Sequence, residues 1–257
     1  MNIIFFAVLV ALCCLRVACV AFFVDQPMVN LLSYDGQTCF NCRNVPGEGS
    51  CLFNSLAACI TYRLQRRHLD FESLDFKELA LRLRQQSIQV LRDENRTLYL
   101  EDGLEVEADK LLNLTAMHYK TTKNEYCEKM KLESTWGGGP EIVALSNELM
   151  LPIHVYELVV KGLWNKRFRV KLMARIGSPK FDDCSTPLCI LCADGRFPDL
   201  KPGEQKNVGD HFQALFVSSP ISSPFNQDTH SSRMKRLLTR GQALWRWIKG
   251  RLMSRSE

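Results

Sequence analysis

A cysteine placed where a glycine-rich turn meets a helix is the feature of this sequence best suited to chemistry. Residues 47–53 read GEGSCLF, and an apolar helical pattern follows directly. Glycines let backbone N–H groups converge on one small space, where an oxyanion could bind. The N-terminal end of a helix favours the thiolate over the thiol. The turn predicts Cys51 as a nucleophile beside an oxyanion site at Gly49 and Ser50, with a buried structural cysteine as the alternative.

A thiol nucleophile needs a base, and the chain has five histidines. His211 starts an alternating strand pattern after the loop of residues 201–210, a position that would bring its imidazole to the edge of a cleft. His154 lies inside a strand pattern, where a structural role is the better interpretation. The others fall in an Arg-rich helix end, an irregular stretch and a polar linker, and they are His68, His118 and His230. His211 is therefore the predicted base.

Helical patterns come first along the chain and strand patterns follow. Helical spacing marks residues 51–66, 75–91 and 141–149, and the second of these helices is expected to begin at Asp75, with an acid three residues later. Strand patterns cover residues 152–158, 166–173, 188–192 and 211–217, and the fully apolar third one predicts a central strand. Residues 92–120 show no clear period. This order predicts an α+β fold with a mixed central sheet flanked by helices.

Three blocks of the sequence resemble the ovarian-tumour (OTU) family of deubiquitinases. GEGSCLF at residues 47–53 resembles its Asp-Gly-x-Cys-Leu-Phe signature. WGGGPEIVALS at 136–146, followed by PIHVY at 152–156, resembles its Trp-Gly-Gly and Pro-Ile-x-Val-Tyr block, and HFQAL at 211–215 is similar to its terminal histidine strand. The blocks occur in the family's order within residues 40–218, a length that one domain can hold.

The resemblance implies a papain-like cysteine protease fold that cleaves isopeptide bonds to ubiquitin without a metal or other cofactor. Cys51 would attack the carbonyl carbon of the last ubiquitin glycine, and His211 would shuttle the proton. Trp136, Gly137 and Gly138 would lie beside the substrate cleft. The partner implied is ubiquitin or a ubiquitinated protein.

Two positions differ from the family pattern, and both have a side chain one methylene longer than usual. Glu48 replaces the Asp before the nucleophile, and Gln213 replaces the Asn or Asp that often orients the histidine ring. Because small displacements lower rates strongly, a catalytically weak or inactive ubiquitin-binding module is the alternative function. A papain-type protease for general peptides is a third hypothesis, which the Trp136 block disfavours.

Other cysteines offer a competing metal hypothesis. Cys39 with Cys42, and Cys189 with Cys192, each form a C-x-x-C pair, and two such pairs can bind zinc. The second pair lies within a strand pattern, where residues three apart face opposite sides of a sheet. Core packing is therefore the preferred interpretation, and no metal site is predicted.

The two ends of the chain differ in composition from its body. Residues 1–24 are nearly all apolar, which predicts a signal peptide or membrane anchor, and residues 25–39 are read as a lead-in to the domain. The leader implies entry to the secretory pathway or membrane anchoring; it also resembles leaders of proteins bound for plastids of secondary origin.

The net charge of +5 arises in the C-terminal tail. A polar linker at residues 219–232 leads to a basic amphipathic helix predicted at residues 233–255, whose partner would be a membrane surface or an acidic protein. The near-neutral body does not indicate nucleic-acid binding.

Overall fold

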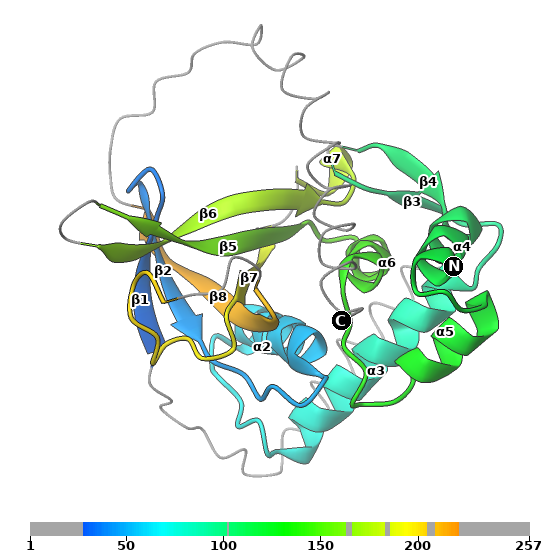
Figure 1. Ribbon diagram of the computed structural model, residues 1–257, viewed down its shortest axis with the longest axis horizontal. Helices are drawn as coiled ribbons and strands as arrows, with labels where there is room; N and C mark the ends of the chain where they lie inside the picture. The colour runs from blue at the N-terminus through cyan, green and yellow to red at the C-terminus, as the bar shows by residue number, and fades with distance from the viewer. Residues whose placement is uncertain (1–27, 102, 163–165, 183–185, 205–208, 221–257) are drawn as a thin grey trace, which may run out of the picture.

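The computed structural model describes residues 28–101, 103–162, 166–182, 186–204 and 209–220 (Figure 1). The predicted leader, at residues 1–24, and the predicted basic helix, at residues 233–255, lie outside this range. No helix within the described ranges has the length and apolar character needed to cross a membrane.

Six strands form a closed barrel in the order β1-β2-β8-β7-β5-β6. The pairs β1–β6 and β5–β7 are parallel and the other four are antiparallel, so the sheet is mixed as predicted. The strands are β1 (Met28–Ser33), β2 (Thr38–Arg43), β5 (Ile153–Lys161), β6 (Arg167–Ile176), β7 (Leu188–Ala193) and β8 (His211–Pro220).

The predicted central strand is confirmed as β7, which lies between β5 and β8 and is buried along its whole length. Its residues alternate between two apolar cores. Cys189 packs inside the barrel with Leu191, whereas Cys192 belongs to the larger core on the helical side with Ile190. The two cysteines therefore face opposite sides of the strand, as the spacing predicts.

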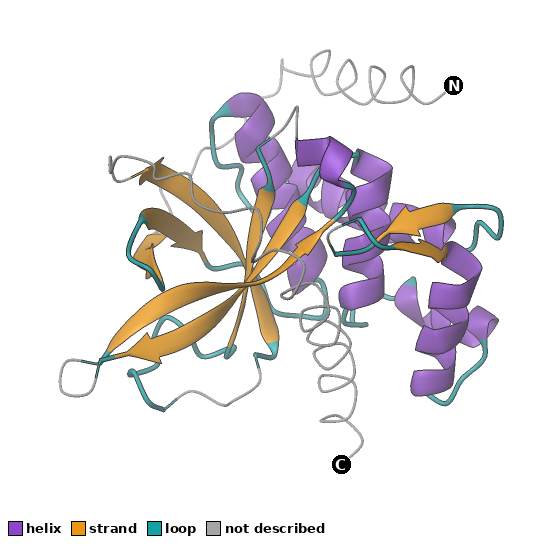
Figure 2. Cartoon of the chain, turned by 90° about the horizontal axis from the view of Figure 1, so that it is seen from above, coloured by secondary structure: helices purple, strands orange, loops and turns teal. Residues whose placement is uncertain are grey.

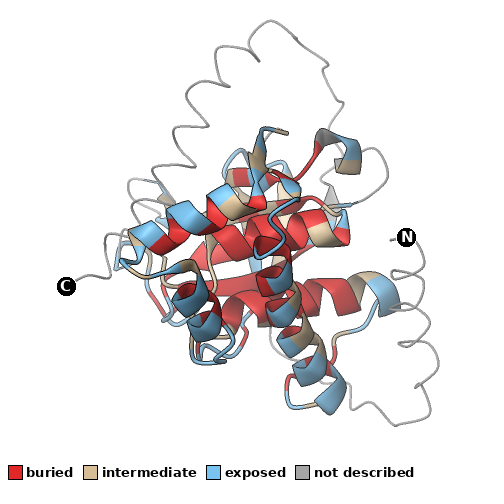
Figure 3. Cartoon of the chain, turned by 90° about the vertical axis from the view of Figure 1, so that its right-hand side faces the viewer, coloured by how far each residue is buried: buried red, intermediate tan, exposed pale blue. Residues whose placement is uncertain are grey.

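The helices gather on one side of the barrel, as Figure 2 shows. They are α2 (Cys51–Gln65), α3 (Leu74–Leu91), α4 (Ala108–His118), α5 (Lys123–Met130), α6 (Gly139–Leu149) and the short α7 (Pro179–Asp182). α2 lies against β7 and β8, and α3 packs on α2 and α6. Figure 3 shows buried faces turned inward and exposed faces turned to solvent, which is how amphipathic helices share one core.

The polar linker predicted at residues 219–232 begins too early, because Ser219 and Pro220 belong to β8 and pair with β2. Three further sequence-based boundaries need correction. α3 starts at Leu74 and is capped by Ser73, whose hydroxyl accepts a hydrogen bond from the Phe76 N–H; the cap is thus not Asp75. The irregular stretch at residues 92–120 contains α4 and a hairpin of β3 (Thr97–Tyr99) and β4 (Glu105–Glu107). These two strands could not be predicted from the sequence, because three residues are too few to show an alternating pattern.

The third correction concerns residues 25–39, which the sequence predicts to be a lead-in before a domain starting at residue 40. β1 and the first residues of β2 belong to the barrel, so the folded unit already includes Met28. Leu31 and Phe40 are buried inside it. β1 also closes the barrel by pairing with β6, where Leu32 lies opposite Arg169, 137 residues later in the chain, and such a long-range pairing leaves no local sequence signal.

Candidate active site

Cys51 is the first residue of α2, and its side chain is almost fully buried, with 1% exposure for the residue. Ser50 occupies the cap position, but its hydroxyl donates to the Glu133 carbonyl at 3.1 Å and makes no capping bond to the first turn. The first turn contains no acidic residue. The positive end of the helix dipole therefore acts on the sulfur without a neighbouring carboxylate in that turn to offset it.

Gly49 allows the turn at residues 47–51, which we call the nucleophile turn, to pack tightly. Its φ is +84°, in the left-handed region that favours glycine. A Cβ at this position would lie 2.5 Å from the Glu133 carbonyl oxygen and closer still to the carbonyl of Ser134. The nucleophile turn is thus held against residues 133–134 with no room for a side chain.

His211 begins β8, and its ring lies beside the nucleophile turn. A Cβ built on Gly47 would be 3.5 Å from Cε1 and 3.6 Å from Nδ1 of the ring. Burial lowers the pKa of His211, while a hydrogen bond with the Val45 backbone and the charge of Asp210 act in the opposite direction. A lowered pKa keeps the imidazole neutral near pH 7, the state that a general base requires.

Gln213, the predicted ring orienter, is fully buried and contacts other groups. Its Nε2 donates to Asn44 Oδ1 at 3.2 Å and to the Phe197 carbonyl at 3.0 Å, and its Oε1 accepts from the Cys42 thiol at 2.8 Å. The hydrogen bond with Val45 is a contact that orients the His211 ring. Direct orientation of the ring by Gln213 stays a prediction.

Glu48 is exposed at the outer side of the nucleophile turn. Among the residues that the structure describes, it has no hydrogen-bond or ion-pair partner. Its carboxylate therefore does not hold Cys51 or His211 in place, and its catalytic role stays a prediction.

The Trp136 block forms the other wall of the site. A Cβ on Gly137 would lie 2.8 Å from Leu52 Cδ2 and 3.0 Å from the Phe53 ring, so glycine permits this turn to approach α2 closely. The Gly138 N–H donates to Glu141 Oε2 at 2.8 Å. Glu141 is fully buried and also accepts a hydrogen bond of 2.6 Å from the Tyr126 hydroxyl. These two hydrogen bonds to the buried Glu141 carboxylate hold the turn at residues 136–138 in place.

An open cleft of about 570 Å³ joins these parts. His211 and Trp136 both line it, together with Asn44, Val45, Pro46, Gly47, Phe71, Gly195 and Asp210. The cleft thus brings one predicted catalytic residue and one predicted cleft residue to the same space. Cys51 is not among the lining residues, in keeping with its 1% exposure.

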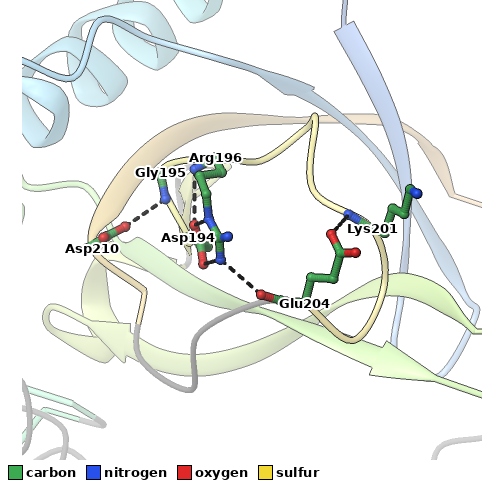
Figure 4. Close-up of polar contacts among 6 residues, drawn as sticks. All are labelled: Asp194, Gly195, Arg196, Lys201, Glu204 and Asp210. Atoms are coloured by element: carbon green, nitrogen blue, oxygen red, sulfur yellow. Dashed lines mark hydrogen bonds and ion pairs between the residues drawn. The ribbon is translucent and has the colours of Figure 1, made fainter.

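The loop between β7 and β8 leads into His211, and Figure 4 shows the polar contacts that shape it. The Asp194 carboxylate accepts Arg196 Nε at 2.9 Å and Nη2 at 2.8 Å, and Arg196 also donates to the Glu204 carbonyl. The Gly195 N–H donates to Asp210 Oδ1 at 2.7 Å. This network fixes Asp210, and with it the start of the strand that carries the histidine.

Sequence reasoning missed several residues of the site. Asp210 could have been suspected because it directly precedes His211. Glu141 lay within a recognised block but received no role. Asn44 and Phe71 lie in loops without a distinctive pattern, and nothing in the sequence pointed to Arg84, whose contacts with the nucleophile turn are described below.

The model of the OTU-like cysteine protease family matches residues 46–189, more than half of the chain. A curated relative, ubiquitin thioesterase otu2 of Schizosaccharomyces pombe, is 28% identical over 113 residues. That match covers 44% of this chain and 31% of the relative, so the chain spans about a third of that protein's length.

Solved structures similar to this fold include viral OTU domains. The Hazara virus OTU bound to ubiquitin has a TM-score of 0.43 at 16% identity, covering 78% of this chain and 97% of that one. The OTU protease of Dera Ghazi Khan virus has a TM-score of 0.41 at 16% identity, covering 75% and 96%. On the family match over residues 46–189, which includes the nucleophile turn and the Trp136 block, this chain belongs to the OTU-like cysteine protease family.

Proposed function

We propose that this protein is a deubiquitinase that hydrolyses peptide and isopeptide bonds at the C-terminus of ubiquitin, with Cys51 as nucleophile and His211 as base. The observation that carries the proposal is the packing of the His211 ring against Gly47, at 3.5 Å from a Cβ at that position. It brings an imidazole to the turn that ends in a cysteine at a helix N-terminus. A thiol, a neutral imidazole and converging backbone N–H groups are the parts that acyl transfer needs.

The reaction follows from these groups. His211 takes the thiol proton, and the Cys51 thiolate forms a bond to the carbonyl carbon of the last ubiquitin residue. The Gly49 N–H, predicted from the sequence as an oxyanion donor, already donates to the Gly47 carbonyl at 2.7 Å. The other backbone N–H groups of the nucleophile turn would therefore stabilise the oxyanion. The C–N bond breaks, and the imidazolium gives its proton to the departing amine. Water, deprotonated by His211, then cleaves the thioester and releases the carboxylate and the thiol.

Ubiquitin as substrate is supported by the relatives rather than by a bound ligand. The curated relative is named a ubiquitin thioesterase, and the Hazara virus domain is described as bound to ubiquitin. The cleft that Gly47, Trp136 and His211 line offers a surface that a slender peptide tail could enter.

The test is reaction of the full chain with ubiquitin that carries a C-terminal alkyne electrophile. We expect a single adduct, larger by one ubiquitin, that disappears in Cys51→Ala and persists in the control variant Cys39→Ala, which changes the one described cysteine that is not buried. Absence of the adduct in the reduced wild-type protein would overturn the proposed activity. An adduct retained by Cys51→Ala would overturn the choice of nucleophile.

A second function is favoured by one observation, the 1% exposure of Cys51. A sulfur closed off from the cleft fits a weak or inactive module that binds ubiquitin without cleaving it. Titration of labelled ubiquitin would decide between the two. Binding without turnover of a fluorogenic ubiquitin substrate supports this alternative, and turnover excludes it.

For the chain ends we propose that residues 3–24 target the protein to a membrane system and that residues 233–255 bind an anionic membrane surface. The proposal rests on their apolar and basic amphipathic composition. Cosedimentation of the full chain with phosphatidylserine vesicles should exceed that of a chain ending at residue 232. Equal binding of the two chains would refute the role of the tail, and a C-terminal fluorescent tag would report the compartment.

A further inference from the structure

Arg84 lies beneath the nucleophile turn and is 1% exposed. It projects from the middle of α3, a helix that packs on both α2 and α6. Its Nη2 donates to the Gly49 carbonyl at 3.3 Å, to Ser50 Oγ at 3.0 Å and to the Glu133 carbonyl at 2.9 Å. Two of these partners are the residues that directly precede Cys51.

The other end of the guanidinium holds the segment on which the nucleophile turn rests. Nη1 donates to the carbonyls of Met130, at 3.0 Å, and Thr135, at 2.8 Å. The guanidinium carbon lies 4.3 Å from the centre of the Phe53 ring, within the distance of a cation–π contact. A single planar group thus joins the nucleophile turn, the first turn of α2 and residues 130–135.

We propose that Arg84 is a positioning residue for the thiol chemistry, which fixes the nucleophile turn through its fork of donors and favours the Cys51 thiolate through its charge. The inference rests on the proposed role of Cys51. It adds a group that touches neither substrate nor the reacting atoms but acts through the nucleophile turn.

The charge argument follows from the surroundings of Arg84. Burial lowers its pKa, and the negative charges of Glu141, Glu133 and the Cys51 sulfur oppose that shift. Because a guanidinium keeps its proton even when buried, Arg84 remains a cation there. The attraction is mutual: a buried cation that gains from a thiolate nearby makes that thiolate easier to form, and low local polarity strengthens the effect.

A purely structural role is the alternative, and the two roles differ in what they do to the titration of Cys51. The test therefore follows carbamidomethylation of Cys51 by iodoacetamide against pH, read by peptide mass spectrometry on protein shown to be folded by circular dichroism. Cys39, partly exposed on β2, serves as an internal reference. The measurement uses no ubiquitin, so its outcome is separate from that of the proposed deubiquitinase activity.

Three variants are compared with the wild type. Arg84→Gln removes the charge and most of the fork, and we expect the thiolate fraction at pH 7 to fall about tenfold. Arg84→Lys keeps a charge but cannot bridge the same acceptors, so we expect a smaller fall. Arg82→Gln, on the same helix but only partly buried and paired with Glu78, should match the wild type.

Wild-type titration of Cys51 in folded Arg84→Gln would overturn the proposal. Should that variant fail to fold, Arg84→Lys decides: a lowered melting temperature with an unchanged Cys51 titration would leave Arg84 only a structural role. A shifted titration supports the proposal even if the protein proves not to react with ubiquitin, in which case the proposed function fails and the coupling of Arg84 to Cys51 stands.

Discussion

The side-chain amide of Gln213 donates a hydrogen bond to the Asn44 side chain, 3.2 Å away, and Asn44 lines the cleft together with His211. The buried glutamine thus positions a polar group at the cleft surface. In the family pattern a shorter side chain two residues after the histidine contacts the ring itself. Here the longer arm of Gln213 reaches Asn44, while the Val45 backbone bonds to His211.

This arrangement predicts that substitutions of Asn44 and Gln213 differ in their effect on stability. Asn44→Ala should lower kcat/KM for a fluorogenic ubiquitin substrate by about tenfold. Its loss of stability should be the smaller one, because Asn44 is exposed and the Gln213 amide keeps its hydrogen bond to the Phe197 carbonyl. Gln213→Ala should also lower the free energy of unfolding, by about 1–3 kcal/mol, because it leaves buried partners unsatisfied. Kinetics and urea unfolding of both variants check this. Equal stability losses, or full activity in Asn44→Ala, would contradict the arrangement.

The close packing of Gly49 predicts a large cost for a single methyl group. Gly49→Ala adds a Cβ where carbonyl groups of residues 133–134 already lie, at a φ of +84°, and should cost more than about 3 kcal/mol. Gly36 is a matched control: its φ is +79°, but nothing lies within 4 Å of a Cβ there.

Gly36→Ala should therefore cost only the backbone strain, about 1 kcal/mol. Urea unfolding of the two variants separates strain from overlap. Similar losses of unfolding free energy in Gly49→Ala and Gly36→Ala would show that the close approach of residues 133–134 to Gly49 adds no cost beyond backbone strain.

The sequence predicted what depends on local spacing. The helical rhythm after Cys51 and the alternation after His211 gave α2 and β8, and the order of three short blocks gave the family. It could not give β1, whose place depends on pairing with β6, nor the role of Arg84, whose contacts with Gly49 and Met130 form only when α3 packs on its neighbours. The contacts of Gln213 could not be predicted for the same reason, since Asn44 and Phe197 lie in loops that are distant in the sequence.

His154, interpreted from the sequence as structural, predicts a pH dependence of stability. Burial lowers its pKa to about 4, with a further contribution from the charge of Arg175, its partner on β6. The unfolded chain therefore binds a proton near pH 6.5 that the folded chain does not bind until about pH 4. Stability that is fully present above pH 6.5 should be lost progressively as the pH falls toward 4.

The loss should amount to about 2–3 kcal/mol at pH 4. His154→Gln should remove that part of the pH dependence, which urea unfolding at a series of pH values would show. If the free energy of unfolding of His154→Gln depended on pH as that of the wild type does, other titratable groups would be responsible for the dependence.

Asp194 and Arg196 form an ion pair in which only one partner is buried, so substitutions of the two residues should differ in their effects. The Asp194 side chain is 1% exposed, whereas that of Arg196 is 56% exposed. Arg196→Ala takes the guanidinium away from a buried carboxylate, whereas Asp194→Asn leaves an arginine that water can solvate. Arg196→Ala should therefore lower the urea midpoint and kcat/KM more than Asp194→Asn does.

Activity should fall because the loop between β7 and β8 holds Asp210 and the start of β8 in position, and β8 begins with His211. Lys201 contributes only its backbone N–H to the network, so Lys201→Ala should behave as the wild type in both assays. If Asp194→Asn proved the more damaging change, the carboxylate itself, and not its pairing with Arg196, would be what holds His211 at the cleft.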